Sequence, residues 1–168
     1  MPTQTLMRNP GEAAADAAAR EFLTFRLGAE SYAIDILKVQ EIRGWEPPTA
    51  IANSPPFIKG VINLRGVIVP ILDLRVKFRL PKAEYDDFTV VIILNVAARV
   101  VGVVVDSVSD VLALAQEAIR PTPEFSSATF DTRYITGLAT VEEQLLILLD
   151  IEKLMTSADM ALVDAATH

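Results

Sequence analysis

The chain has 168 residues, of which 51% are hydrophobic and 22% are charged, so it is long enough to bury a substantial core without covalent staples. Its formal net charge of -7 argues against binding to duplex nucleic acid or to acidic membrane lipids, because both would repel such a surface. It contains no cysteine, which excludes disulfides, thiolate nucleophiles and zinc–thiolate sites.

The first part of the chain predicts a tail followed by a β-hairpin. Residues 1–20 are polar and rich in alanine, lack a signal-peptide pattern, and are expected to be a disordered tail. From Glu21 onward, apolar residues alternate on both sides of a turn at 28–31, which is typical of a hairpin. Prolines in 47–56 then mark a connecting loop.

A second strand pair is predicted for 61–64 and 67–72, joined by the turn Asn63-Leu64-Arg65-Gly66. Asparagine first and glycine last suit a type I turn, which would leave Leu64 and Arg65 at its tip. An exposed apolar residue beside an arginine could anchor a partner protein. Alternatively, Arg65 could fold onto an acid such as Glu41 and stiffen the hairpin. Both roles could hold together.

The second part of the chain predicts further strands, a long connector and a helix. The most apolar stretch, 90–105, is shorter than the roughly 20 residues of a membrane helix and is interpreted as two buried strands. The connector 112–133 contains Phe125 in a proline-stiffened loop, where it could contact a partner or plug the protein's own core. The apolar spacing of 150–164 favours an amphipathic helix.

The two parts resemble each other. A shift of 69 residues lays 22–42 over 91–111 without a gap, and a shift of 77 residues lays 57–74 over 134–151. Alternating valines alone could produce some of this agreement. However, two ungapped blocks in the same order, with glycines and acids matched, favour an internal repeat. Within the second block, Arg65 is replaced by Glu142.

The repeat predicts the fold. Each half would contain four to five short strands, and closing so small a sheet into a barrel removes its exposed edges. We therefore expect an all-β-dominated chain of two small barrels, 21–84 and 85–152, that share an apolar seam. A C-terminal helix and tail would follow at 153–168.

No catalytic residue is predicted. The only histidine, His168, is the last residue, and the chain contains neither a Gly-x-Ser-x-Gly elbow nor a glycine-rich phosphate loop. The acid pairs at 86–87 and 142–143 could hold a metal but are more typical of solvated turns. Arg75, Lys77 and Arg79 would form a basic stripe on one strand. That stripe suits either a nucleic-acid groove or, as the net charge favours, a charge-protected edge strand.

Five motifs together point to a family: Glu-Phe-Leu at 21–23, Ile-Asp-Ile-Leu-Lys-Val-Gln-Glu-Ile at 34–42, Phe-Ile-Lys-Gly at 57–60, Asn-Leu-Arg-Gly-Val-Ile-Val-Pro-Ile-Leu-Asp-Leu-Arg at 63–75, and Ile-Arg-Pro at 119–121. They resemble the CheW family of bacterial chemotaxis coupling proteins, close to its enterobacterial members. The resemblance runs from about residue 20 to the end. It implies two SH3-like five-stranded β-barrels around a common core.

The resemblance also implies a function. Family members are non-enzymatic cytoplasmic adaptors without a cofactor, which join the cytoplasmic tips of membrane-associated chemoreceptor arrays to the histidine kinase CheA. Neither nucleic acid nor direct membrane insertion is implied. The family's receptor surface, carried over residue by residue, falls on Val39, Glu41, Gly60, Arg65 and Val111.

The implied kinase surface lies on the second barrel, where the kinase's regulatory domain would pack. Its candidates are Arg120, Glu124 and Phe125. The receptor's helical hairpin would lay apolar residues into the seam near Val39 and Val111.

Overall fold

The computed structural model describes residues 19–80, 84–96, 98–121 and 134–155. Within them the chain is built almost entirely of strands. The elements are β1 (Arg20–Leu27), β2 (Glu30–Asp35), η2 (Ile36–Lys38), β3 (Val39–Gly44), β4 (Ile58–Leu64), β5 (Val67–Asp73), α2 (Leu74–Lys77), β6 (Val90–Val96), β7 (Arg99–Val105), β8 (Ser107–Leu114), η3 (Gln116–Ala118), β9 (Ile135–Val141), β10 (Gln144–Leu149) and α3 (Ile151–Met155).

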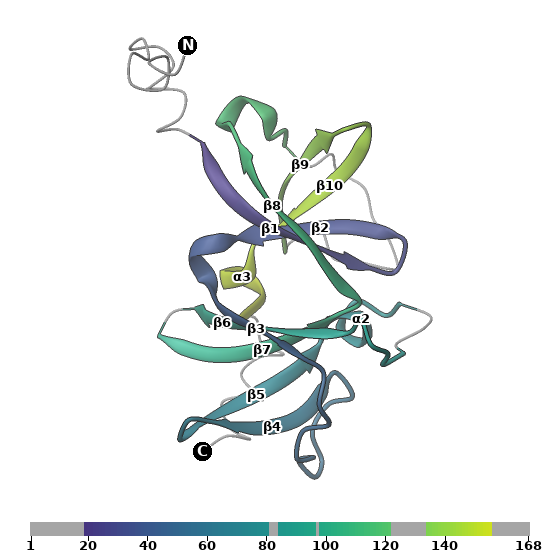
Figure 1. Cartoon of the computed structure of the whole chain (residues 1–168), viewed down its shortest axis with the longest axis vertical. Coiled ribbons are helices and arrows are strands. Elements are labelled where there is room, and N and C mark those ends of the chain that lie inside the picture. The colour runs from purple at the N-terminus through teal and green to yellow at the C-terminus, as the bar shows by residue number, and fades with distance from the viewer. Residues whose placement is uncertain (1–18, 81–83, 97, 122–133, 156–168) are drawn as a thin grey trace.

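The strands form two five-stranded, SH3-like sheets, one above the other in Figure 1. The β1 sheet has the order β8-β1-β2-β10-β9, and the β3 sheet has the order β3-β6-β7-β5-β4. All neighbours are antiparallel except β2–β10 and β5–β7. The predicted hairpin, second strand pair and two buried strands are β1–β2, β4–β5 and β6–β7, so these predictions are confirmed.

The internal repeat is confirmed strand by strand. Each strand of the β3 sheet has an equivalent in the β1 sheet that lies five strands away along the chain. In sheet order, β3, β6, β7, β5 and β4 correspond to β8, β1, β2, β10 and β9. The registers also agree. Ile42 lies opposite Ile92 in one sheet, and the equivalent Val111 lies opposite Leu23 in the other. The two halves therefore have the same fold.

The halves exchange their first hairpins. β1 and β2 pair with β8, β9 and β10, whereas β6 and β7 pair with β3, β4 and β5. The boundary expected between residues 84 and 85 therefore does not separate the sheets, since one sheet uses 20–35 with 107–149 and the other uses 39–105. Equivalent hairpins carry the same apolar alternation, so the pattern shows that they are related but not which copy each one joins.

Three apolar clusters hold this arrangement together. The largest contains Phe25, Leu27 and Ile34 from the β1 sheet and Ile92 and Leu94 from the β3 sheet, all fully buried between the sheets. It is the predicted shared seam. The two smaller clusters each lie within one sheet. Burying apolar area of this extent is the dominant favourable term in folding.

In each sheet, a glycine in one strand lets an earlier segment of the chain pass close to that strand and pair with it. Gly60 has φ +145°, and an added Cβ would lie 2.1 Å from the Thr49 carbonyl oxygen. Thr49 and Val61 exchange backbone hydrogen bonds of 2.9 and 2.8 Å across this point. The equivalent crossing joins Arg120 and Leu138 beside Gly137.

A buried arginine network connects the sheets. Arg75 is fully buried and binds Asp73 through Nε and Nη2, at 2.9 and 3.0 Å. Its Nη1 donates to Asp106 Oδ1 at 2.8 Å, and Asp106 Oδ2 accepts from the Gly28 backbone of the β1–β2 turn at 2.6 Å. The Tyr85 hydroxyl donates to Asp73 at 2.7 Å. The prediction of a basic stripe on one strand is therefore wrong, because Arg75 lies in α2 and its side chain is buried in this network.

Candidate functional site

The tip of the β4–β5 hairpin carries Arg65. Leu64 and Val67 pair across the strands, so the turn consists of Arg65 and Gly66, with φ values of +51° and +89°. Positive φ at both positions is typical of a type I′ turn, which matches the twist of the strands. The predicted type I turn is wrong for this reason, and Leu64 is a buried strand residue rather than an exposed anchor.

Arg65 reaches back to the edge strand of the same sheet. Its Nη2 donates to Glu41 Oε1 on β3, and Arg43 Nη1 lies 3.6 Å from Glu41 Oε2. The carboxylate of Glu41 is thus bracketed by two guanidinium groups. We call these three residues the arginine rim. The hydrogen bond from Arg65, with the charges of both arginines, holds the pKa of Glu41 below its ordinary value.

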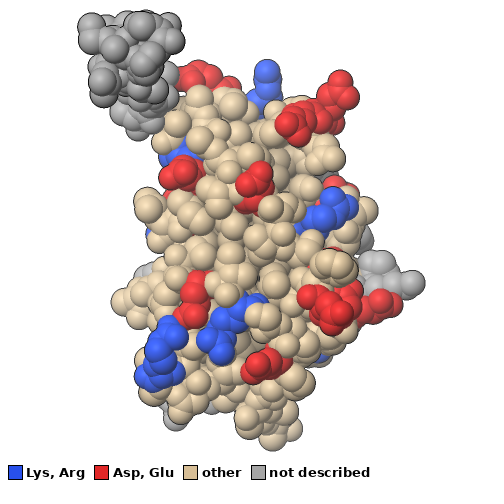
Figure 2. Space-filling model, viewed as in Figure 1, with Lys and Arg blue, Asp and Glu red and all other residues tan. Residues whose placement is uncertain are grey.

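The rim presents an ordered positive surface. The Arg65 side chain is 66% exposed even though it is paired, so it remains accessible to solvent. Figure 2 shows basic side chains gathered over this end of the β3 sheet beside an acidic one. A paired arginine loses less conformational freedom on binding than a free one, because its fork is already oriented.

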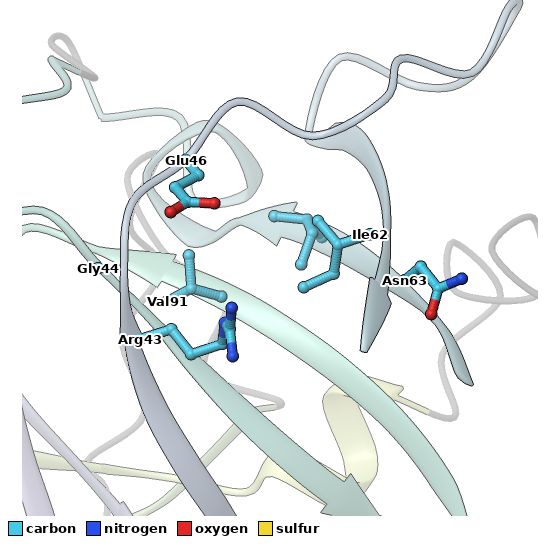
Figure 3. A pocket seen from close by; sticks show the side chains of 7 residues that line it. Arg43, Gly44, Glu46, Ile62, Asn63 and Val91 are labelled. Atoms are coloured by element: carbon cyan, nitrogen blue, oxygen red, sulfur yellow. The ribbon is translucent and has the colours of Figure 1, made fainter. Parts of the chain in front are cut away.

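A small cavity lies beside the rim, between β3 and β4. It has a volume of about 110 Å³, and Arg43, Ile62 and Val91 are among the residues that line it. Figure 3 shows the Glu46 and Val91 side chains directed toward it from one side and Ile62 from the other. This mixture of polar and apolar groups can accept one small side chain of a partner.

The other predicted receptor residues occupy different environments. Val39 is half-buried and packs on the core between the sheets. Gly60 is buried and serves the loop crossing described above, so its role there is one of backbone geometry. Val111 is 44% exposed on β8 of the β1 sheet. The structure therefore brings Glu41 and Arg65 into contact on the β3 sheet and places Val111 on the other sheet.

The predicted kinase residues are only partly described. Arg120 is exposed, and its backbone pairs with Leu138, at 2.8 and 2.9 Å. Glu124 and Phe125 lie outside the described residues.

The sequence reasoning missed Arg43 and the partners of Arg75. Arg43 lies two residues after Glu41, so both side chains share one face of β3, and this spacing was available in the sequence. The role of Arg75 depends on Asp106, which is distant along the chain. In the described ranges, no three potential metal-binding side chains lie together. None of the helices in that part of the chain is long and apolar enough to cross a lipid bilayer.

Comparison with known proteins gives a consistent result. The model of a family described as the CheW-like domain matches residues 21–159. The chain is 62% identical over 151 residues to the chemotaxis protein CheW of Klebsiella aerogenes, covering 90% of each chain. It is 33% identical over 148 residues to the CheW of Bacillus subtilis, covering 87% of this chain and 94% of the relative.

A solved structure shows the same arrangement. The crystal structure of the scaffolding protein TtCheW from Thermoanaerobacter tengcongensis matches with a TM-score of 0.76 and 30% identity. The match covers 83% of this chain and 90% of that one. The predicted paired SH3-like sheets are therefore confirmed by both topology and comparison.

Proposed function

The chain belongs to the CheW family and is a chemotaxis coupling adaptor, and from this premise we propose that it joins the cytoplasmic tips of chemoreceptors to a CheA-type histidine kinase. It acts by holding its partners in position, without catalysis, in the cytoplasm at membrane-associated receptor arrays. Weak individual contacts suffice there because many copies are engaged at once.

The arginine rim is the observation that carries the proposal for the receptor. Two guanidinium groups fixed on one carboxylate form an oriented donor surface, which suits the acidic and amide groups of a helical hairpin. Val39 borders the core between the sheets, and Val111 offers a half-exposed apolar contact on the other sheet. Receptor contacts to both sheets would fix their relative position on the receptor.

The kinase would be contacted through the β1 sheet. Arg120 lies at the crossing beside Gly137, on the connector that also contains Glu124 and Phe125. A regulatory domain with a similar fold would pack there pseudo-symmetrically. A separate surface for each partner is what an adaptor requires.

The receptor role of Arg65 is tested by binding of the purified chain to a soluble receptor hairpin, measured by calorimetry. We expect Arg65→Ala to weaken binding about two- to fivefold, the range for one exposed charged contact. Arg20→Ala is the matched control, because Arg20 also makes an exposed pair, with Asp35 at 2.7 Å. Equal effects of the two variants would contradict the proposal.

Glu41→Gln tests whether Glu41 orients Arg65 for receptor binding or whether Arg65 contacts the receptor without it. If Glu41 orients Arg65, Glu41→Gln weakens receptor binding, and the exchange Arg65→Glu with Glu41→Arg restores part of it. If Arg65 contacts the receptor alone, the exchanged variant stays as weak as Arg65→Ala.

Phe125→Ser tests the second surface and should lower kinase binding while leaving receptor binding intact.

A further inference from the structure

A groove lies at the end of the β1 sheet, between β8 and the tip of the β9–β10 hairpin. Its volume is about 250 Å³. Leu112, Leu145 and Leu146 supply apolar surface, and Asp110 and Glu142 supply exposed carboxylates. Leu145 is 50% exposed. The groove is therefore both apolar and acidic.

Among the described residues, no cationic side chain forms an ion pair with the carboxylates of this groove. In the part of the chain that the structure describes, neither Asp110 nor Glu142 takes part in an ion pair. Arg26 also lines the groove, but its Nη2 donates to the Ala29 carbonyl at 3.4 Å. Figure 2, in the same view as Figure 1, shows acidic side chains over the β9–β10 tip and basic ones over the β4–β5 tip. The two equivalent hairpins therefore carry opposite charge.

The internal repeat relates this groove to the arginine rim of the first half. Asp110 is equivalent to Glu41 of the arginine rim, because 41 and 110 differ by the repeat shift of 69. In the first half, that acid is bracketed by Arg43 and Arg65. The residues equivalent to these arginines are Leu112 and Glu142. The acid is thus retained, while neither of the two equivalent positions carries a guanidinium group.

The turn keeps its acids in an unfavourable conformation. Glu142 and Glu143 have φ values of +50° and +68°, where the first half has arginine and glycine. Glycine adopts such angles without steric cost, whereas glutamate does not. Two adjacent like charges add repulsion. At position 143 glutamate carries a steric cost that the equivalent Gly66 avoids, whereas Glu142 and its equivalent Arg65 share a φ near +50°.

We propose that this groove binds an arginine flanked by aliphatic residues, presented by a partner protein. The guanidinium group lies against Asp110 and Glu142, as Arg65 lies against Glu41, and the flanking side chains cover Leu112 and Leu145. Arginine fits better than lysine, because its planar fork binds carboxylates in two-pronged fashion and is more weakly hydrated. The inference rests on the proposed adaptor function only in taking the occupant to be a protein.

The probe is the peptide acetyl-Leu-Arg-Leu-amide, titrated into the ¹⁵N-labelled full chain and followed by amide chemical shifts. We expect saturable shifts confined to residues around Asp110, Leu112, Val141 and Leu145. The same peptide with citrulline in place of arginine keeps the shape but loses the charge, and it should bind about tenfold more weakly. Shifts spread over the surface, or equal binding of both peptides, would overturn the proposal.

Two variants complete the test. Asp110→Asn with Glu142→Gln should weaken binding of the arginine peptide about tenfold. Asparagine retains the acceptor that takes the Val111 backbone N–H at 2.8 Å, so the fold is kept. Glu142→Asn with Glu143→Gly relieves the turn and should also weaken binding, so loss of binding cannot be ascribed to unfolding. Glu41→Gln is the control and should leave this peptide's affinity unchanged.

The outcomes are distinguishable from those for the adaptor function. A chain that couples receptor and kinase but shows no arginine-dependent binding in this groove contradicts the groove proposal alone. A chain that binds the peptide but neither receptor nor kinase contradicts the proposed partners alone.

Discussion

Gly60→Ala tests whether Gly60 serves the backbone rather than a partner. The substitution places a Cβ 2.1 Å from the Thr49 carbonyl oxygen and forces alanine to adopt φ +145°. The strained backbone costs about 1–3 kcal/mol. Moving Thr49 away also weakens its two hydrogen bonds to Val61, at 2.9 and 2.8 Å, each worth about 1 kcal/mol. We therefore expect the free energy of unfolding to fall by about 2–5 kcal/mol.

Urea unfolding monitored by circular dichroism measures this difference. Gly44→Ala is the matched control, because Gly44 also lies in a strand of the β3 sheet, but its added Cβ would meet no atom within 4 Å. It should change the free energy of unfolding by less than about 0.5 kcal/mol. If Gly60→Ala unfolded as the control does yet lost receptor binding, Gly60 would be a contact residue and our reasoning would be refuted.

Three further predictions concern charge and turns. Arg75→Met should lower the free energy of unfolding by about 3–5 kcal/mol, because it leaves the buried Asp73 carboxylate uncompensated, and a loss below about 1 kcal/mol in urea would contradict the network. The pKa of Glu41 is lower in the folded state than in the unfolded state. The stability that the Glu41 carboxylate contributes is therefore complete above its unfolded pKa and is lost as the pH falls through its folded pKa. NMR titration of Arg65→Ala should show the pKa of Glu41 rising toward its ordinary value. Glu143→Gly should stabilise the chain by about 1 kcal/mol, because glycine tolerates the φ of +68°, and thermal unfolding that occurs earlier in the variant would be the opposite result.

The sequence predicted those features that depend on local alternation. The strands and the repeat follow from apolar residues at every second position, and the shift of 69 residues matches the pairing of Ile42 with Ile92 to that of Val111 with Leu23. The alternative in which Arg65 folds onto Glu41 is also present in the structure. This ion pair was predictable because Arg65 lies in a turn and Glu41 is an acid that could reach it.

What the sequence did not predict depends on contacts between distant residues. Pairing of β1 with β8 joins segments far apart in the chain, and β6 would have offered β8 the same alternation. The burial of Arg75 depends on Asp106 and Tyr85, which periodicity does not connect to it. Leu64 was misplaced because a one-residue difference in turn register moves a side chain to the other face of the strand.

Retention of a CheA-type kinase on receptor-bearing membranes, measured by co-sedimentation with and without the chain, tests the coupling role most directly. We expect kinase to sediment with the membranes only when the chain is added, and Arg65→Ala to lower the retained amount while Arg20→Ala does not. Kinase retention that is the same without the chain, or unchanged by adding the folded chain, would contradict the coupling role.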